Sequence, residues 1–453
     1  MATTQRGAVT GLSIFLSRLG LLSVSFLLLA AAPYKPPKTG TRTVYRHAVL
    51  IDGRNPQARA DTAVVVDGEM IVAVLPDRDL SQAQLDGSQQ VDLTGKFLLP
   101  GLIDTHQHLA TPPNRRAAEL LLERLVYSGI TSIRDMADDL RQVADLGRAA
   151  RVGEIASPDI FFAALMAGPS FFDDPRTHAV ALGAEPGAVP WMQAIDERTN
   201  MPLAVARAKG TDATAIKIYA NLPAETVAAI TGEAHRQGMR VWAHGMVFPA
   251  TPSEVVDAGV DTVSHSCYLA YQAMQKRPDS YQHRFPVDAG LFRDNNAVMS
   301  KLFADMVRRG TILDATLQVY PRIESAAKAQ NKPPLCTVGL AARLTNWAWR
   351  AGVVISTGTD GETPSEEPWP ALFDELELLH DKAGLPTSAV LAAATFNGAK
   401  AAGQEKLLGT VEPGKLANMV VLTKNPLEDV RNFRSVMLTV KRGRQFLRAD
   451  YEP

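Results

Sequence analysis

Apolar and polar residues follow two different spacings along this chain. From residue 44 to 98, and again from 403 to 453, short segments alternate apolar with polar residues and are separated by turns that contain Gly or Asp. This pattern is typical of antiparallel strands. The segments are TVYRHAVLIDG, TAVVVDGEMIVAV, QQVDLTGKFLL, MVVLTKN and SVMLTVKRGRQFL. Two β-rich ends around a different middle predict one small β-sandwich domain that is built from both termini.

The middle of the chain, residues 99 to 402, alternates strand-like runs with helical stretches about eight times. The helix expected in PAETVAAITGEAHRQG is well marked, because it has proline near its start and Gly238 after its end. Eight βα repeats predict an α/β fold, namely a (β/α)₈ TIM-like barrel with its active site at the carboxyl ends of the strands. The strands are expected in FLLPGLIDTHQH, ITSIRDM, IFFAALMAG, AIKIYA, RVWAHG, DTVSHS, TILDATL and VVISTGTD.

The first 32 residues have the composition of a secretory signal peptide. Arg6 and Arg18 precede an apolar run, Leu19 to Ala32, that ends in small residues. This run is shorter than the roughly 20 residues that a membrane-spanning helix needs. We therefore expect a secreted or periplasmic protein with a signal peptide at 1–32 and a linker at 33–43. After signal removal we expect no stable membrane insertion, and an uncleaved membrane anchor is the alternative.

Composition excludes several classes of partner. The 48 acidic and 47 basic residues nearly cancel, and no block of like charge indicates binding to nucleic acid or to a lipid surface. Apolar residues make up 46% and charged residues 21% of the chain, as in an ordinary globular enzyme. The two cysteines, Cys267 and Cys336, do not make a disulfide scaffold, and the sequence does not decide whether they pair. The sequence also leaves open whether the protein forms a homo-oligomer.

Six side chains of metal-binding type lie near the ends of the predicted barrel strands. They are His106, His108, Lys217, His244, His265 and Asp360. Because side chains alternate between the two faces of a strand, His106 and His108 point the same way. Lys217 and Tyr219 share the inward face of their strand, and Tyr219 is therefore the candidate substrate contact. A lysine held inside a barrel needs a partner or a changed charge state.

Each of these residues also has an ordinary structural explanation. Histidines are common on surfaces and in cores, a buried lysine is usually an ion-pair partner, and Asp before Gly usually marks a turn. These explanations do not account for all six residues at strand ends and in this order. The set therefore predicts a site for two divalent metal ions. Cys267 is a conceivable further ligand, but four histidines are already available.

At these residues the chain resembles the amidohydrolase superfamily of metal-dependent hydrolases, from about residue 44 to the C-terminus. The motifs that carry the resemblance are LLPGLIDTHQHL and GTVEPGKLANMVVL. In the second motif, Asn418 and Met419 stand where aspartate and leucine are usual, which leaves the catalytic residues untouched. Lys217 resembles the lysine of the branch related to prolidases and imidazolonepropionases, which is commonly carboxylated on N6 and bridges two metals.

The resemblance implies a ligand set and a reaction. One metal would be held by His106, His108 and Asp360, the other by His244 and His265, with carboxylated Lys217 between them. Zinc suits imidazole and carboxylate ligands, although manganese or cobalt would also bind. Two such ions share a water, lower its pKa and polarise a carbonyl. Asp360 would then act as the catalytic residue that moves the proton from this water to the leaving amine.

We therefore expect a secreted, metal-dependent amidohydrolase that cleaves the amide (C–N) bond of small-molecule substrates, namely dipeptides or N-acyl amino acids. The alternative is a mononuclear cyclic amidohydrolase or deaminase of the imidazolonepropionase type, against which Lys217 argues because one metal needs no bridge. A barrel that only binds its ligand is a third hypothesis. The long loops at 169–200 and 268–299 would shape the pocket.

Overall fold

The computed structural model describes residues 41–452 of the chain, without 55–56, 293–295, 362–363 and 365–366. The predicted signal peptide and nearly all of the predicted linker lie outside the described residues. Within the described ranges, no helix combines the length and the apolar character that crossing a membrane requires.

Eight parallel strands form the predicted barrel, in the order β6, β7, β8, β11, β12, β13, β14 and β15. The ring closes between β6 and the segment after β15, where the backbone N–H of Thr105 donates to the carbonyl of Thr357 at 2.7 Å. The short strands β9 and β10 extend the sheet beside the carboxyl-terminal half of β8. The bounds are β6 Leu102–Gln107, β7 Ile130–Asp135, β8 Asp159–Ala167, β9 Ala188–Val189, β10 Met192–Ala194, β11 Ala215–Ile218, β12 Arg240–His244, β13 Thr262–Ser264, β14 Ile312–Asp314 and β15 Ile355–Ser356.

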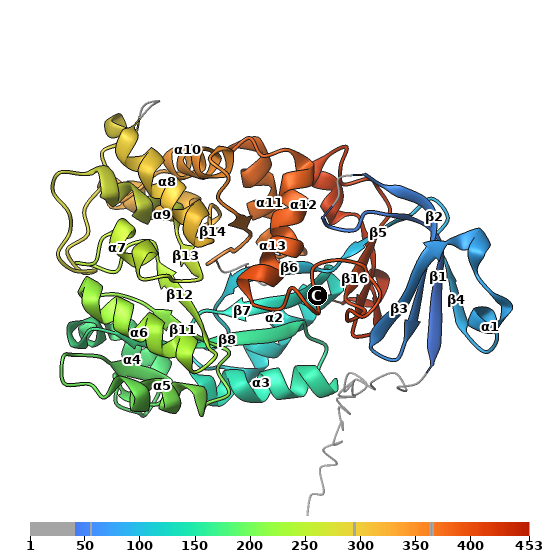
Figure 1. The fold of residues 1–453 in the computed structure, drawn as a ribbon, viewed down its shortest axis with the longest axis horizontal. Coiled ribbons are helices and arrows are strands. Elements are labelled where there is room, and N and C mark those ends of the chain that lie inside the picture. Colours follow the sequence, from blue (N-terminus) through green and yellow to red (C-terminus); the bar gives the residue numbers. More distant parts are fainter. Residues whose placement is uncertain (1–40, 55–56, 293–295, 362–363, 365–366, 453) are drawn as a thin grey trace, which may run out of the picture. The chain divides into compact units, whose positions relative to one another are not determined.

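Helices follow the barrel strands and surround them (Figure 1). The predicted helix after Lys217 is α6, which follows its N-cap Pro223 and ends before Gly238, whose φ is +78°. Its buried residues Val227, Ile230 and Ala234 lie on one face, as helical spacing requires. The helices are α1 Gln82–Leu85, α2 Arg115–Tyr127, α3 Leu140–Val152, α4 Pro175–Ala181, α5 Met201–Lys209, α6 Ala224–Arg236, α7 Pro252–Asp257, α8 Ala297–Arg309, α9 Val319–Ala329, α10 Val338–Arg350, α11 Leu372–Asp381, α12 Thr387–Ala394 and α13 Phe396–Ala401.

Strands from both termini form one small β domain, as predicted. Its order is β18-β17-β16-β5-β1-β2-β3, with β4 also paired to β1, so the sheet divides where β4 and β5 share one edge of β1. The sheet encloses its own apolar core, which includes Val64, Leu98, Val421 and Val440. Its exact domain limits stay predictions. The bounds are β1 Arg42–Leu50, β2 Arg59–Asp67, β3 Met70–Pro76, β4 Gln89–Asp92, β5 Phe97–Pro100, β16 Met419–Leu422, β17 Val436–Lys441 and β18 Arg444–Leu447.

Asp159, the first residue of β8, connects the amino end of the barrel to the small sheet. Its buried carboxylate lies 3.0 Å from Lys441 Nζ and accepts hydrogen bonds from Arg442 Nε at 2.8 Å and Asn418 Nδ2 at 3.2 Å. Burial alone would raise the pKa of Asp159, but the two cations outweigh burial and lower it. Asn418, the unusual residue of the closing motif, thus donates to a carboxylate that an aspartate would repel.

Candidate metal and active site

The structure brings the six predicted ligands to the carboxyl end of the barrel. His106 lies on β6, Lys217 on β11 and His244 at the end of β12, and His108 follows β6 by one residue. His265 directly follows β13, and Asp360 lies in the segment after β15. Their φ values are +72° and +45°, a left-handed conformation that is uncommon for residues other than glycine and that gathers at functional sites.

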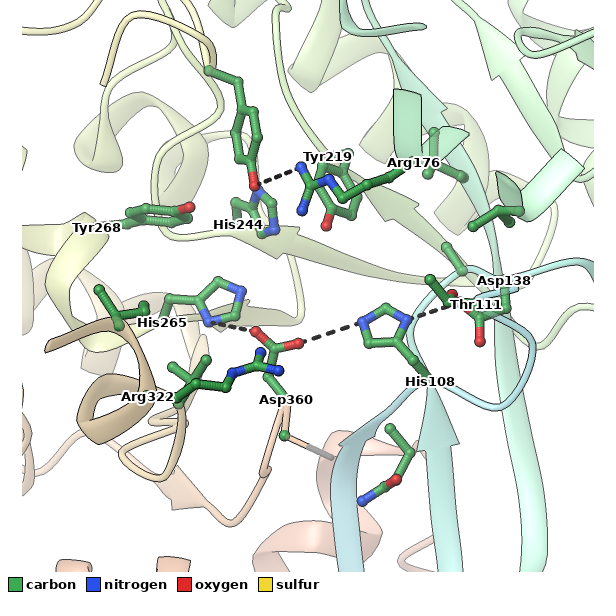
Figure 2. Close-up of a pocket in the computed structure, with 18 of the residues that line it drawn as sticks. His108, Thr111, Asp138, Arg176, Tyr219, His244, His265, Tyr268, Arg322 and Asp360 are labelled. Carbon is green, nitrogen blue, oxygen red and sulfur yellow. Dashed lines mark hydrogen bonds and ion pairs between the residues drawn. The ribbon is translucent and has the colours of Figure 1, made fainter. Parts of the chain in front are cut away.

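Asp360 is the centre of this group (Figure 2). Its Oδ1 lies 3.6 Å from His106 Nε2. Figure 2 shows its contacts with two other histidines: Oδ1 lies 3.5 Å from His108 Nε2, and Oδ2 lies 3.7 Å from His265 Nδ1. The ligand atoms of His106, His108 and Asp360 all lie within 4.8 Å of one another. Burial opposes ionisation of Asp360, but the surrounding imidazoles outweigh burial and lower the pKa of its carboxyl. Asp360 is therefore an anion with three imidazole nitrogens around it.

Carboxylates orient two of the imidazoles from behind. His106 Nδ1 lies 2.8 Å from Asp314 Oδ2, and His108 Nδ1 lies 2.8 Å from Asp138 Oδ1. Each of these histidines therefore directs its Nε2 toward Asp360, as is usual for metal-ligating histidines that a second residue fixes. Burial would lower the pKa of His108, but Asp138 and Asp360 raise it well above its usual value. A metal ion at His108 would consequently displace a proton.

His244 and His265 form the other half of the group, with ring centroids 5.0 Å apart. Burial, and then the charge of Lys217, lowers the pKa of His244 well below its usual value, so this imidazole is neutral. Its Nδ1 is buried and has no hydrogen-bond partner among the described residues. Burial lowers the pKa of His265 to about 3 although Asp360 opposes the shift. Both rings thus offer lone pairs rather than charge.

Lys217 is completely buried and has no carboxylate within ion-pair distance among the residues that the structure describes. Its Nζ donates to Ser264 Oγ at 3.3 Å, and Ser264 in turn donates to Asp314 at 3.1 Å. Burial lowers the pKa of Lys217 to about 7, against the opposing charge of Asp314. A large share of this side chain is therefore a neutral amine near neutral pH.

Asp314, at the end of β14, is a residue that the sequence analysis missed. It is completely buried and accepts hydrogen bonds from Thr105 Oγ1 at 3.0 Å, Ser264 Oγ at 3.1 Å and Arg134 Nη2 at 3.3 Å, in addition to its contact with His106. Gly358 makes room for it, because a Cβ at that position would lie 2.1 Å from Asp314 Oδ1. The sequence feature that could have identified Asp314 is its position inside the apolar strand TILDATL. An aspartate that is buried in such a strand needs a partner.

A pocket of about 780 Å³ opens above Asp360, and His108, His244 and His265 also line it. Tyr219, the predicted substrate contact, lines this pocket, with its ring centroid 4.2 Å from that of His244 and 4.7 Å from that of Phe171. Residues from both predicted long loops, Phe171 and Tyr281 among them, complete an aromatic wall. Whether Tyr219 binds substrate stays a prediction.

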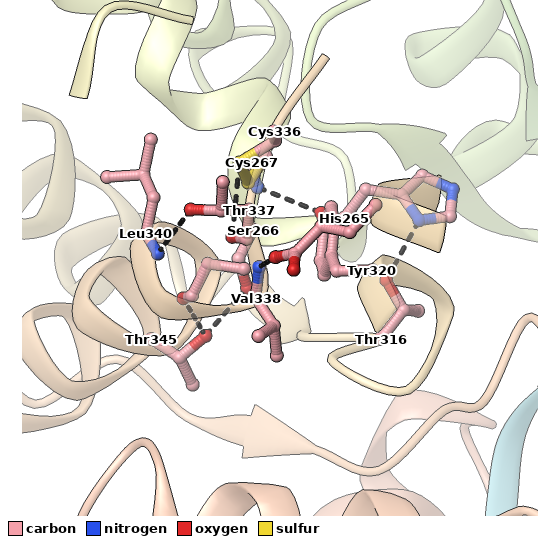
Figure 3. Close-up of a disulfide and its surroundings, with 12 residues drawn as sticks. His265, Ser266, Cys267, Thr316, Tyr320, Cys336, Thr337, Val338, Leu340 and Thr345 are labelled. Carbon is pink, nitrogen blue, oxygen red and sulfur yellow. Dashed lines mark hydrogen bonds between the residues drawn. A yellow bond between two sulfur atoms is a disulfide. The ribbon is translucent and has the colours of Figure 1, made fainter. Parts of the chain in front are cut away.

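Cys267 and Cys336 also line the pocket, and they form a disulfide (Figure 3). This settles the pairing that the sequence left open. It also excludes Cys267 as a free thiolate ligand beside His265.

The donor set fits divalent metals. It combines four imidazoles, an ionised carboxylate and a buried amine, which are ligand types suited to zinc once the amine is converted to a carboxylate. The unpartnered His244 Nδ1 and the unpaired Lys217 are the buried polar groups that such ions would satisfy. Metal binding by these six residues remains a prediction.

The family model described as "Amidohydrolase family" matches residues 97–445. The chain therefore belongs to the amidohydrolase family, and it is a hydrolase that acts on carbon–nitrogen bonds.

Three relatives illustrate this likeness. Ochratoxinase from Aspergillus niger is 23% identical over 435 residues, which cover 86% of this chain and 83% of that enzyme. Imidazolonepropionase from Pseudomonas putida is 32% identical over 126 residues, so the match spans only 28% of that enzyme and 27% of this chain. A solved Xaa-Pro dipeptidase with bound methionine superposes with a TM-score of 0.70 at 23% identity, and the match covers 90% of this chain and 100% of that one. The last likeness concerns the fold alone.

Proposed function

We propose that this protein is an exported, binuclear metal-dependent amidase that hydrolyses the amide bond of dipeptides or N-acyl amino acids. The observation that carries the proposal is the convergence of His106, His108 and His265 on the Asp360 carboxylate, within 3.7 Å. The 23% identity to an A. niger ochratoxinase along most of both chains, and the shared fold of a dipeptidase, agree with this reaction class.

In this proposal His106, His108 and Asp360 would hold one ion, most simply Zn²⁺, and His244 and His265 would hold the other. The neutral amine of Lys217 attacks CO₂, a nitrogen–carbon bond forms and one proton is released, which leaves an anionic carboxylate on N6. This carboxylate would be a further ligand for the ions. When bound, the two ions supply an acidic water and polarise the scissile carbonyl.

The residues of the chain then hold the substrate and move the proton. Asp360 accepts a proton from the attacking water and delivers it to the nitrogen of the leaving amine. Asp314 and Asp138 keep the two imidazoles aimed at Asp360 during this transfer, because each holds the opposite ring nitrogen at 2.8 Å. Tyr219, beside His244, would contact the substrate at the pocket wall.

The alternative is a mononuclear enzyme of the imidazolonepropionase type. The 32% identity to imidazolonepropionase favours this alternative, but it covers only 126 residues. The unpaired, buried Lys217 favours the binuclear form, because a single ion would leave this amine without a role. Metal stoichiometry separates the two.

Metal analysis of purified protein, together with hydrolysis assays on dipeptides and N-acyl amino acids, tests the proposal. We expect two equivalents of metal per chain, and His106→Ala should lower metal content and nearly abolish hydrolysis. His235→Ala is the matched control, since His235 lies on α6 and pairs with Asp261 outside the pocket. One equivalent in the active wild type supports the alternative, and full activity of a metal-free His106→Ala variant overturns both.

Export is part of the same proposal. It rests on the N-terminal composition and agrees with the Cys267–Cys336 disulfide, because disulfides persist mainly in oxidising compartments. N-terminal sequencing of native protein from an envelope fraction should begin near Pro33, and an intact Met1 would contradict cleavage.

A further inference from the structure

Four arginines line the pocket above Asp360, and they differ in what they contact. Arg124 donates to the backbone carbonyl of Pro364 at 2.7 Å. Arg176 lies 2.6 Å from Asp174, and Arg284 Nε donates to the carbonyl of Tyr281 at 2.7 Å. These three guanidinium groups are therefore already engaged in holding the pocket walls.

The fourth arginine, Arg322, has no hydrogen bond and no ion pair with any residue in the described part of the chain, and its side chain is exposed. In Figure 2 it extends from α9 toward Asp360. The acidic residues among the described pocket lining are Asp138 and Asp360, and both are occupied by imidazoles. An exposed cation that lines the pocket is thus left without a carboxylate partner among the described lining residues.

The helix that carries Arg322 is fixed on several sides. Before its first turn, the backbone N–H of Gln318 donates to the buried Glu375 at 2.7 Å. Tyr320 accepts a hydrogen bond from the backbone N–H of Cys267 at 3.1 Å, next to the disulfide (Figure 3). Because the backbone of this helix is already held, binding a ligand has to order only the Arg322 side chain, and the planar fork of its guanidinium matches a carboxylate.

We propose that Arg322 binds the free carboxylate of the substrate and makes the enzyme select amides of amino acids over neutral amides. The inference rests on the proposed function, because it names the group of that substrate which this arginine recognises. The aromatic wall of Phe171, Tyr219 and Tyr281 then faces the acyl part, so the favoured substrates carry an apolar or aromatic acyl group.

Binding of a ligand that cannot be hydrolysed tests Arg322 apart from catalysis. N-benzyl-phenylalanine has no N-acyl bond to hydrolyse, and its carboxamide carries a neutral amide in place of the carboxylate. Calorimetry on the metal-loaded enzyme should give Arg322→Met a roughly 10- to 100-fold weaker affinity for the acid and an unchanged affinity for the carboxamide. Arg322→Lys should recover part of the loss, and Arg350→Met, on the exposed side of α10, should bind like the wild type.

Equal affinity of the wild type for acid and carboxamide overturns the role of Arg322, as does an equal loss on both ligands in Arg322→Met. Hydrolysis of N-benzoyl-phenylalanine is measured alongside on the same proteins. If the acid-specific loss of binding is found but no amide is hydrolysed, the proposed function fails and the assignment of Arg322 stands.

Discussion

Two buried lysines, Lys217 inside the carboxyl end of the barrel and Lys441 on β17 beside its amino end, differ in the partners that surround them. Lys441, at the amino end, lies 3.0 Å from Asp159 and donates to the carbonyl of Ala150 at 2.8 Å. Lys217, at the carboxyl end, donates only to Ser264 Oγ, at 3.3 Å, among the described residues. Their exposed fractions are 1% and 0%, so the difference lies in their partners and not in their burial.

The comparison separates a buried lysine that is paired with a carboxylate from one that is not. A buried charge costs several kcal/mol unless it is paired, so a paired lysine such as Lys441 connects two parts of a fold. Burial lowers the pKa of both lysines, but for Lys441 the adjacent Asp159 opposes the shift directly. For Lys217 the shift reaches a pKa of about 7. An unpaired, perturbed lysine in a cleft that holds four histidines indicates chemistry.

The largest effect is expected from Lys217→Arg. Guanidinium stays cationic and cannot take up CO₂, so the variant should lose more than about 100-fold in activity, beyond the usual effect of a residue that only orients a ligand. Metal content should fall with it. Lys217→Ala should lose similar activity and recover part of it when propionate fills the space. Steady-state assays with metal analysis measure both effects.

Lys209→Arg is the control for this substitution, because Lys209 is exposed on α5 and donates to the backbone carbonyl of Gln237. Wild-type activity and two metals in Lys217→Arg would make Lys217 a structural residue like Lys441. The proposed bridge would then be wrong.

Asp159→Asn should produce the opposite outcome at the other end of the barrel. It leaves Lys441 buried without its carboxylate, as Lys217 is, and the free energy of unfolding should fall by about 3–5 kcal/mol. Activity per folded molecule should not change. The folded pKa of Lys441 would lie further below its unfolded value, so the unfolded state binds more protons and the deficit should shrink as the pH rises. Urea unfolding at pH 7 and pH 9 measures this.

Asp279→Asn is the matched control, since Asp279 is exposed and its ion pair within the described ranges is with the exposed His283. It should change stability by less than about 1 kcal/mol. If Asp159→Asn also lowers the free energy of unfolding by less than about 1 kcal/mol, water reaches Lys441. Pairing with Asp159 would then not be what distinguishes Lys441 from Lys217.

The positions of Lys217 and of the histidines could be predicted from the sequence, but their hydrogen-bond and ion-pair partners could not. Strand alternation placed Lys217 and Tyr219 inside the barrel, and strand ends placed His244 and His265 together, because these are local rules. The partners of these residues come from distant segments. Asp314 meets His106 across 208 positions of the chain, and no local pattern encodes that contact.

The same reason applies to Arg322 and to Asn418. Arg322 is distinguished from the other pocket arginines only by the absence of a partner in the described part of the chain, which a sequence does not display. Asn418 departs from the family motif, and this is visible in the sequence. The reason for the departure is its hydrogen bond to Asp159, which lies 259 positions away. The sequence therefore predicted the helices, the strands and the residues proposed as metal ligands. The structure was needed to find the residues that hydrogen-bond to those ligands from behind.

The smallest effect is expected at an ion pair that is more exposed than either lysine. Asp77, in the small domain, accepts from Arg46 Nε at 3.1 Å and from Arg46 Nη2 at 2.6 Å. Asp77 is nearly buried, but the Arg46 side chain is 28% exposed, so solvent screens the pair. The hydrogen bonds from Arg46 are the main cause that lowers the pKa of Asp77, against the effect of burial.

Because its folded pKa lies below its unfolded value, Asp77 stabilises the fold at neutral pH and loses this effect as the pH falls through the folded pKa. Asp77→Asn should therefore cost about 1 kcal/mol at pH 7, with a smaller difference from the wild type toward pH 3. Urea unfolding across this range measures the difference. Asp77 also lies within 4.8 Å of His47 and Asp61, but Arg46 already occupies both of its oxygens. A zinc-dependent rise in stability that Asp77→Asn abolishes would show instead that this group, like Lys217, is open to a ligand.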